Sequence, residues 1–288
     1  MIITYGRYSS IYYSKLDNTV IKHIKDNYIH SAEWFKECII SEYLCNKNNY
    51  GLLMPVKEIL KNNKKEIYGI KMPYYKYTLD SYLLDIDNNL TEKDFMMIFY
   101  RLVLGLKILH TNKIIHADIK YENIFLNNIN DICIGDFDNC VFYDIKLSSN
   151  NNLFERFIDI NSNLQTIFFR APEITAGKNY SNKIDIWSLG IICKKIYKWE
   201  NKMFKNIIDE MLIIDQNDRI DIDKLYEKLI NNNFKFINFK VEIINLLDFQ
   251  SENTNDIIID NKQSKIIMKY IKSREVPYQI LALAIEYM

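Results

Sequence analysis

Two short segments near the middle of the chain decide the fold and the chemistry. The first carries a histidine, two acidic residues, a lysine and an asparagine: His116-Ala117-Asp118-Ile119-Lys120-Tyr121-Glu122-Asn123. The second, Asp136-Phe137-Asp138, begins thirteen positions after Asn123, beyond two short runs of apolar β-forming residues. Such runs predict a β-hairpin. We therefore expect the polar side chains of the first segment to meet Asp136 at one edge of that hairpin.

This grouping has the side chains that phosphoryl transfer needs. Asp118 supplies a general base and Lys120 a cation. Asn123 and Asp136 supply oxygen ligands of the kind that Mg²⁺ prefers, and Mg²⁺ usually keeps substrate phosphates in its coordination shell. Transfer of a phosphoryl group requires charge neutralisation, alignment and a nearby acceptor for the hydroxyl proton. The pattern therefore predicts a phosphotransferase site.

The order of the motifs along the chain resembles the eukaryotic protein kinase family. The family's catalytic loop H-R-D-x-x-x-x-N corresponds to residues 116–123 and its D-F-G to residues 136–138. Three further family elements follow: Ala171-Pro172-Glu173, Asp185-Ile186-Trp187-Ser188-Leu189-Gly190 and Asp218-Arg219. A histidine or aspartate met singly is more often a packing or turn residue, so the ordered set carries the resemblance. The residues expected to hold the scaffold are His116, Phe137, Trp187 and the Glu173–Arg219 pair.

The resemblance implies an α+β, bilobal fold, in which a small β-rich lobe with one main helix precedes a larger, mainly helical lobe. We expect lobes over 1–73 and 74–232, and a C-terminal helical tail of unknown role over 233–288. Hydrophobic periodicity supports this order. The expected elements are strand–turn–strand over 2–24, a helix over 31–44 capped by Ser31, strands over 52–60 and 66–72, helices over 79–84 and 95–110, short strands at 114–115, 124–126 and 132–134, a functional loop over 139–165, and helices over 185–198, 204–214 and 222–230.

The resemblance also assigns a nucleotide site to the first lobe. Residues 4–12 align with the family's glycine loop, of which only Gly6 is kept. Val20-Ile21-Lys22 matches the V-A-I-K strand, so Lys22 is the expected ligand of the α- and β-phosphates. Glu37 is the expected partner of Lys22, with Glu33 and Glu42 as competitors. The expected cofactor-binding residues are Ile3, Gly6, Ile11, Lys22, Glu37 and Met72, with Ile11 and Met72 beside the adenine.

The implied activity is that of a serine/threonine protein kinase, which transfers the γ-phosphate of Mg-ATP to a protein hydroxyl. Asp118 would orient the hydroxyl and accept its proton, and Lys120 would neutralise the moving phosphate. Thr166 would tie these two residues together and completes the expected catalytic set. Asn123 and Asp136 are the expected ligands of Mg²⁺, with Mn²⁺ as an alternative. The competing function is a pseudokinase that acts as a nucleotide-binding or scaffold module.

Several positions depart from the family pattern. Ala117 replaces the arginine that normally receives an activation-loop phosphate, so switching by such a phosphate is not expected. Asp138 replaces a glycine and adds negative charge near the metal site, while Thr4 and Ser9 replace two glycines of the phosphate loop. These changes motivate the pseudokinase alternative. The arginine at position 170, directly before Ala171-Pro172-Glu173, resembles the pattern of the subgroup that contains the cyclin-dependent and mitogen-activated kinases.

Composition excludes several other classes of protein. The 288 residues carry 37 basic and 37 acidic side chains, and 48% are hydrophobic against 26% charged, which excludes a disordered chain. A net charge near zero gives no reason to expect nucleic-acid or membrane partners. Only 7 Gly and 4 Pro are present, and abundant Ile, Asn, Lys and Tyr indicate an AT-rich genome such as that of a large DNA virus or some protists.

The remaining features bear on location and partners. No apolar stretch reaches the ~18–20 residues of a membrane span, and we expect no secretory signal. The five cysteines show no C-x-x-C pair, which favours a reducing compartment. We therefore expect a cytoplasmic protein, found in the host cytoplasm or the virion if it is viral. Its partners would be ATP and a protein substrate, and its tail either packs on the large lobe or holds a regulatory partner.

Overall fold

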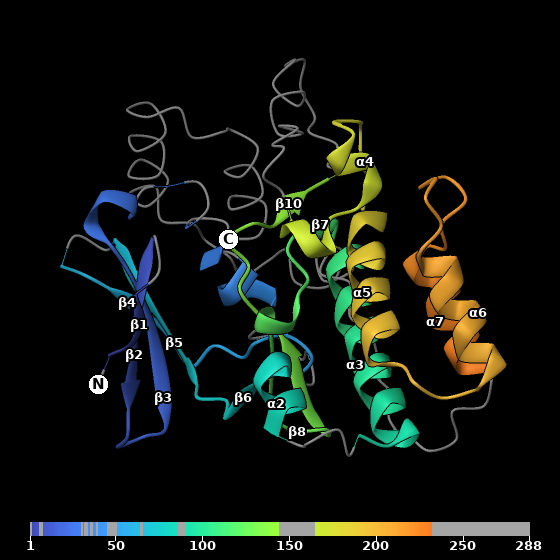
Figure 1. Ribbon diagram of the computed structural model, residues 1–288. Coiled ribbons are helices and arrows are strands. Elements are labelled where there is room, and N and C mark those ends of the chain that lie inside the picture. The colour runs from blue at the N-terminus through green and yellow to red at the C-terminus, as the bar shows by residue number, and fades with distance from the viewer. Residues whose placement is uncertain are drawn as a thin grey trace, which may run out of the picture.

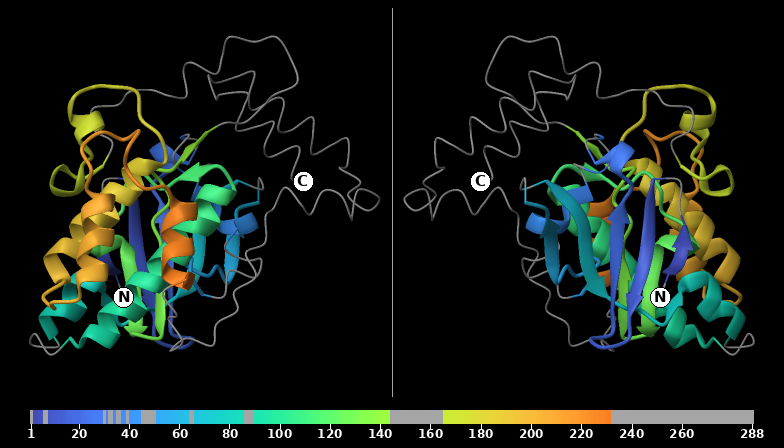
Figure 2. Two further views of the ribbon diagram at one scale, coloured as in Figure 1. Left: turned by 90° about the vertical axis from the view of Figure 1, so that its right-hand side faces the viewer. Right: turned by 90° about the vertical axis from the view of Figure 1, so that its left-hand side faces the viewer.

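The computed structural model describes residues 2–5, 8–29, 31, 34, 37–38, 40–44, 51–63, 66–85, 90–143 and 165–231. Within them a β-sheet built from the first 73 residues lies beside a larger body of helices and short strands (Figure 1). When the left-hand side of Figure 1 is turned towards the viewer, the strands of this sheet stand in front of the helices (Figure 2). An α+β fold of two unlike parts is therefore present, as expected.

The sheet is antiparallel, and its five strands follow the order β1-β2-β3-β5-β4. The expected turn between β2 and β3 falls at residues 15–18, where Asn18 adopts a left-handed backbone (φ 51°), which asparagine tolerates better than most residues. The strands are β1 (Ile2–Tyr5), β2 (Ser9–Ser14), β3 (Thr19–Ile24), β4 (Glu58–Lys61) and β5 (Ile67–Pro73).

The register of the sheet gathers the expected nucleotide-binding positions on one face. Lys22 of β3 lies directly opposite Ile11 of β2 and Ile70 of β5, and Met72 lies opposite Val20. Directly opposed residues of antiparallel strands share a face, and so do alternate residues of one strand. Ile11, Met72 and Lys22 therefore lie on the same face of the sheet.

One strand prediction was wrong in part. The run 52–60 does not form one strand, because β4 begins only at Glu58. The preceding residues pair with the other part of the molecule: Met54 N donates to Ile134 O at 2.7 Å, and Ile134 N donates to Leu52 O at 2.9 Å. Pro55 follows, which has no backbone N–H to continue a ladder. The apolar run therefore joins the two parts instead of lengthening the sheet.

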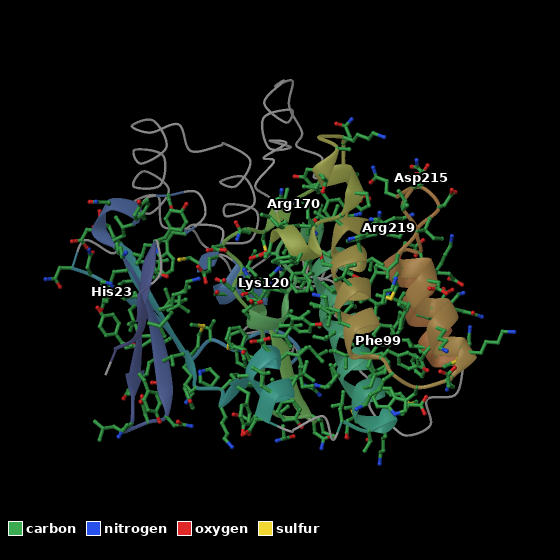
Figure 3. All side chains as sticks on the ribbon, in the orientation of Figure 1. His23, Phe99, Lys120, Arg170, Asp215 and Arg219 are labelled. Atoms are coloured by element: carbon green, nitrogen blue, oxygen red, sulfur yellow. The ribbon has the colours of Figure 1, made fainter. Side chains whose placement is uncertain are left out.

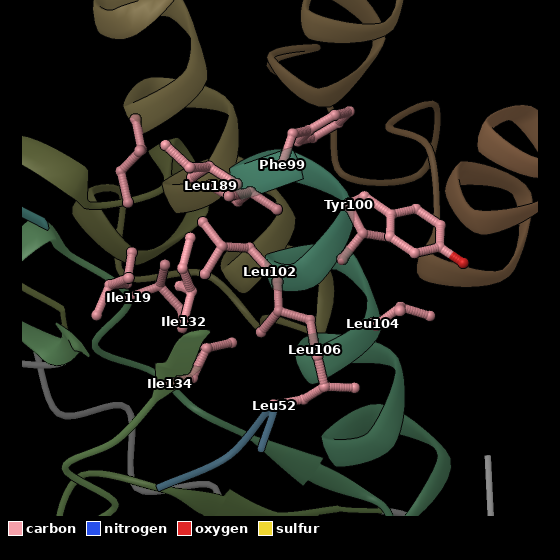
Figure 4. Packing of buried hydrophobic residues seen from close by; sticks show 14 of the residues in the cluster. Leu52, Phe99, Tyr100, Leu102, Leu104, Leu106, Ile119, Ile132, Ile134 and Leu189 are labelled. Atoms are coloured by element: carbon pink, nitrogen blue, oxygen red, sulfur yellow. The ribbon is translucent and has the colours of Figure 1, made fainter. Parts of the chain in front are cut away.

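The long helix α3 (Glu92–Thr111) is the centre of the larger part. Its start is set by a capping box, in which Thr91 Oγ1 accepts from Asp94 N at 3.2 Å and Asp94 Oδ2 accepts from Thr91 N at 3.0 Å. In Figure 4, Leu102 and Leu106 lie towards Ile132 and Ile134, whereas Tyr100 and Leu104 point to the other side of the helix. Because α3 has apolar side chains on two sides, it packs against other elements on both of those sides.

A glycine in α3 allows its close contact with the β-hairpin. A Cβ added at Gly105 would lie 2.9 Å from Ile134 Cδ1 and 3.1 Å from Leu52 O. Distances of this kind leave no room for a side chain. The glycine therefore lets α3 lie against the same two residues that join the two parts of the molecule.

Short strands and helices complete the larger part. They are β6 (Tyr77–Thr78), α2 (Leu79–Asp85), β7 (Ile114–Ile115), η3 (Tyr121–Asn123), β8 (Ile124–Asn128), β9 (Asp131–Ile134), β10 (Val141–Phe142), η5 (Ile167–Phe169), α4 (Pro172–Thr175), α5 (Lys183–Ile196), α6 (Lys202–Met211) and α7 (Ile222–Asn231). Those at 77–78, 121–123, 141–142, 167–169 and 172–175 were not predicted, and the strand at 141–142 falls within the loop expected over 139–165; the others lie close to expected positions. Helix α6 begins two residues earlier and ends three residues earlier than its predicted range, 204–214. No helix in the described part of the chain is long and apolar enough to cross a bilayer.

Two sequence predictions lie outside the described residues. Most of the functional loop over 139–165 is one, since residues 144–164 are not described. The tail over 233–288 is the other. The predicted helix over 31–44 is described only in part. Trp34 N donates a hydrogen bond to Ser31 Oγ at 3.2 Å, as expected of a cap, and Ile40–Leu44 forms a π-helical turn.

Candidate active site

Lys22 on β3 contacts two acidic residues of the site, Glu37 and Asp136. Its Nζ donates to Glu37 Oε1 at 2.7 Å and to Asp136 Oδ1 at 2.6 Å. The side chains of Lys22 and Glu37 are buried, whereas that of Asp136 is partly exposed. The pairing of Lys22 with Glu37 is the one that the sequence predicted. The competitor Glu33 and the side chain of Glu42 lie outside the described residues.

The charges around Lys22 act strongly on one another. Burial alone would lower the pKa of Lys22, but the charges of Asp136 and Glu37 outweigh burial and raise it. Burial raises the pKa of Glu37 to about 7 against the opposing effect of Lys22. Burial also acts to raise the pKa of Asp136, but the charge and hydrogen bond of Lys22 prevail and lower it. Lys22 therefore stays protonated. Of the two carboxylates that it contacts, Asp136 has a lowered pKa and Glu37 a raised one, so Asp136 is the one more readily ionised.

The catalytic loop brings three expected residues into direct contact, at the position of the Lys120 label in Figure 3. Lys120 Nζ donates to Asp118 Oδ2 at 2.7 Å and to Thr166 Oγ1 at 3.2 Å. Thr166 closes the set, because its Oγ1 and its backbone N donate to Asp118 Oδ1 at 2.9 and 3.2 Å. Both carboxylate oxygens of Asp118 are thus held by fixed donors.

Asn123 is oriented by the same aspartate. Its Nδ2 donates to Asp118 O at 2.9 Å and to Asp118 Oδ2 at 3.2 Å. The amide nitrogen is therefore occupied, and the amide oxygen is the atom available as a ligand. The hairpin of β8 and β9 places Asn123 next to the second segment, since Gly135 N donates to Asn123 O at 3.0 Å.

The loop backbone is held by a buried aspartate that the sequence analysis treated only as part of a motif. Asp185 Oδ2 accepts from His116 N at 2.8 Å, and Asp185 Oδ1 accepts from Ala117 N at 2.9 Å. His110 Nε2 lies 2.9 Å from Asp185 Oδ2. These bonds hold Ala117 in a left-handed conformation (φ 61°), which costs a non-glycine residue energy. The signal that could have revealed this contact is an aspartate placed between Ile184 and Ile186 in the first turn of the helix.

Ala117 lies where the motif of the catalytic loop has an arginine, and its surroundings are apolar. It has no exposed surface and packs with Ile115, Ala171, Ile174 and Ile184. This cluster joins the catalytic loop to α4 and α5 without a charged group. The expectation that a phosphate does not switch the loop through this position is consistent with that packing, and it stays a prediction.

Gln165 is a positioning residue that the sequence analysis missed. Its side chain is buried, and Oε1 accepts from Ala171 N at 2.8 Å while Nε2 donates to Ser188 Oγ at 2.8 Å. Its backbone O accepts two bonds from Arg170 at 3.0 and 3.3 Å. Gln165 thereby fixes the segment that carries Thr166. Its place directly before Thr166 was the only signal in the sequence.

The residues at this site fit a divalent metal ion. The amide oxygen of Asn123 and the carboxylate of Asp136 are hard oxygen donors, and such donors suit Mg²⁺ or Mn²⁺. Asp136 adopts a left-handed backbone (φ 67°), and its Oδ1 accepts a hydrogen bond from Lys22 Nζ at 2.6 Å. These two residues would hold the ion. Bound there, the ion would offset negative charge on phosphate oxygens.

Two of the expected cofactor-binding positions are not described fully. Gly6 and the side chain of Ile3 lie outside the described residues. Ile11 and Met72 lie on the face of the sheet that carries Lys22, which is compatible with the expected adenine contacts. Their roles remain predictions.

Comparison with known proteins identifies the family. A family model described as "Protein kinase domain" matches residues 3–260. The chain belongs to the protein kinase family. The match covers both parts of the described fold and reaches into the segment over 233–288 that was predicted to be a separate tail.

The chain is similar to viral and cellular relatives. It is 34% identical to the serine/threonine-protein kinase US3 homolog of Varicella-zoster virus (strain Dumas), over 46% of this chain and 32% of that protein. It is 29% identical to the serine/threonine-protein kinase US3 of Human herpesvirus 1 (strain 17), over 56% and 31%. It is 28% identical to the CTD kinase subunit alpha of Saccharomyces cerevisiae, over 67% and 35%. The matched part spans about a third of the length of these curated relatives.

Proposed function

We propose that the chain is an active serine/threonine protein kinase that transfers the γ-phosphate of Mg-ATP to a protein hydroxyl. The observation that carries the proposal is the closed set of bonds among Asp118, Lys120 and Thr166. A chain that only binds nucleotide has no chemical need for a carboxylate held on both oxygens. The names of the viral relatives support the same activity.

Asp118 is the general base of this proposal. Its Oδ1 is oriented by Thr166 and its Oδ2 by Lys120, so the carboxylate cannot rotate away from an incoming hydroxyl. General-base catalysis of this kind contributes about 10²–10⁴ to a rate. Lys120 keeps its positive charge, because its bond to Asp118 and the nearby carboxylates outweigh burial and raise its pKa. Its ammonium stabilises negative charge as the phosphate moves.

Lys22 and the two metal-ligand candidates would hold the nucleotide. Lys22 lies between Glu37 and Asp136, so its ammonium is aimed before any phosphate arrives. Such preorganisation lowers the cost of binding. Asn123 and Asp136 would hold Mg²⁺, which supplies charge neutralisation on the phosphates.

A transfer assay with two variants tests the proposal. The chain is incubated with Mg²⁺, labelled ATP and a panel of basic and acidic proteins, beside Asp118→Asn and the control Asp209→Asn, which changes an exposed aspartate on α6. Asp118→Asn should lower transfer by about 10²–10⁴, and Asp209→Asn should leave it unchanged. Transfer that persists in Asp118→Asn would refute the assignment of the base.

The same preparation tests the pseudokinase alternative. A pseudokinase would be stabilised by Mg-ATP in a thermal unfolding experiment but would transfer no label to any protein of the panel. Stabilisation that requires both ATP and Mg²⁺, together with transfer, supports the active kinase and the metal-binding roles of Asn123 and Asp136.

A further inference from the structure

Asp138 brings an additional carboxylate to the nucleotide site. It lies two residues after Asp136, at a position where the family motif has glycine. Its side chain is partly buried, and its Oδ1 is inaccessible to solvent and has no hydrogen-bond partner among the described residues. A buried carboxylate oxygen without a donor is costly, since native proteins almost always satisfy such atoms.

The carboxylates at this site outnumber the ammonium groups near them. Lys22 is hydrogen-bonded to Glu37 and Asp136, and the negative charge of Asp138 also acts on Lys22. Asp138 also repels the negative charge of Glu37 and that of Asp136. The ammonium of Lys22 is therefore shared among three carboxylates.

Lys120 offsets only part of this negative charge, because its ammonium acts on Asp136 but is shared with Asp118. Lys120 Nζ is bonded to Asp118 and Thr166. Asp118 itself adds to the negative charge that acts on Asp138. The site thus combines an unsatisfied oxygen, excess negative charge and two hard oxygen donors already assigned to a metal ion. This combination suits a divalent cation better than a further hydrogen-bond donor.

We propose that Asp138 is an additional metal-binding residue, and that with Asp136 and Asn123 it lets this kinase bind a divalent cation before nucleotide arrives. Mg²⁺ sites with one or two carboxylates usually rely on substrate phosphates to complete the shell. A further carboxylate raises the charge of the protein's own ligand set and reduces that reliance. The inference rests on the metal site of the proposed function and adds to it a residue and an order of binding.

The test measures metal binding directly, without ATP or substrate. Mn²⁺ is titrated into the nucleotide-free full chain and followed by electron paramagnetic resonance and by calorimetry. The variants are Asp138→Asn, which keeps the shape but removes the charge, and Asp138→Gly, which restores the family residue. Asp209→Asn on α6 is the matched control for loss of one acidic charge.

We expect Mn²⁺ affinity to fall by about tenfold or more in Asp138→Asn, the scale on which even outer-shell partners of metal ligands act. The Mn²⁺ affinity of Asp138→Gly should be lower still, and that of Asp209→Asn should equal the affinity of the natural chain. Equal affinity in all four proteins, or no binding to the natural chain, would overturn the proposal.

Thermal unfolding in metal-free buffer checks that the variants fold. Removal of the third carboxylate should leave the melting temperature equal or higher, while Mn²⁺ should raise it most in the natural chain. Because these readouts need no phosphoryl transfer, they separate the two proposals. A chain that binds Mn²⁺ through Asp138 but transfers no phosphate would refute only the kinase activity.

Discussion

Arg219 and Glu173 form a buried, bidentate ion pair between α4 and the loop that precedes α7. Arg219 Nη1 donates to Glu173 Oε1 at 2.7 Å, and Nη2 donates to Oε2 at 2.9 Å. The guanidinium is almost fully buried, and it also donates to the backbone carbonyls of Ile213, Lys183 and Ile214. The label in Figure 3 places Arg219 beside α5, away from Lys120. This pair was expected to be structural, and its position agrees with that role.

Loss of Glu173 should therefore destabilise the fold. Glu173→Ala leaves a buried guanidinium without its carboxylate, and breaking a buried pair costs about 3–5 kcal/mol. Urea unfolding measures the change. The control is Glu200→Gln, which breaks an exposed pair with Lys205 and should cost about 0–1 kcal/mol. A small effect of Glu173→Ala would mean that the backbone carbonyls alone satisfy Arg219.

Thr166 should affect the chemical step more than binding. Thr166→Ala removes a hydroxyl that donates to Asp118 and accepts from Lys120. Hydrogen bonds to charged groups contribute about 1.5–3 kcal/mol, so kcat should fall by about 10–100-fold. Thr166→Ser keeps the hydroxyl and should restore most of the rate. Steady-state kinetics in which Thr166→Ser is as slow as Thr166→Ala would contradict the role of the hydroxyl.

Glu37 should make stability depend on pH in the metal-free protein. Its pKa is raised from 4.5 to about 7. Between these two pH values the folded chain binds more protons than the unfolded chain, so the free energy of unfolding falls as the pH rises through this window. Glu37→Gln should flatten this dependence.

The pH prediction is measured as a difference between proteins. Thermal unfolding of the natural chain and Glu37→Gln is compared from about pH 5 to about pH 8, which brackets the upper part of the window. Glu58→Gln, at an exposed position on β4, is the control and should keep the dependence of the natural chain. Parallel curves for all three proteins would show that Glu37 does not titrate in this range.

The exposed residues next to Thr166 should influence substrate choice. Ile167 and Phe168 are 74% and 77% exposed, although both are apolar. Because Thr166 contacts Asp118, a hydroxyl presented to Asp118 brings the neighbouring substrate residues close to this pair. We expect peptides with an apolar residue beside the acceptor to be preferred.

A charge at this position should reverse that preference. Phe168→Glu should lower kcat/KM for such peptides by about tenfold, equivalent to about 1.4 kcal/mol, and should improve peptides with a basic neighbour. Ile214→Glu changes an equally exposed residue between α6 and α7 and serves as the control. The prediction fails if a peptide array gives the same ranking for Phe168→Glu and the natural chain.

Local patterns predicted most of the elements of the larger part. The apolar period over 95–110 lies within α3, and the short runs at 124–126 and 132–134 lie within β8 and β9. The failure at 52–60 has a physical cause, because one apolar run there is divided between two partners. Periodicity reports that residues are buried but does not report against what.

The candidate site was predictable to a similar degree. Asp118 and Lys120 are two residues apart, so local backbone geometry can bring them together. Asp185 lies 67 residues beyond Asp118, and Gln165 reaches Ser188, so neither contact could be read from spacing. Positioning residues of this kind depend on how distant elements pack.

The sequence by itself determined which chemical groups are present and in what order. The spacing of Asp118, Asn123 and Asp136 is a local property. The alternation of residues along β8 and β9 and the turn between these strands are enough to set it. The family and the expected reaction follow from these residues.

Only the tertiary structure decided which carboxylates share the charge of Lys22. The pairing with Glu37 depends on how a helix packs against the sheet, and the buried oxygen of Asp138 depends on what surrounds it. Burial changes the energy of a charge far more than its place in the sequence does, because desolvation and neighbouring charges act through space. The sequence shows only that Asp138 departs from the family motif, and the packing around its Oδ1 is what makes this residue a candidate metal ligand.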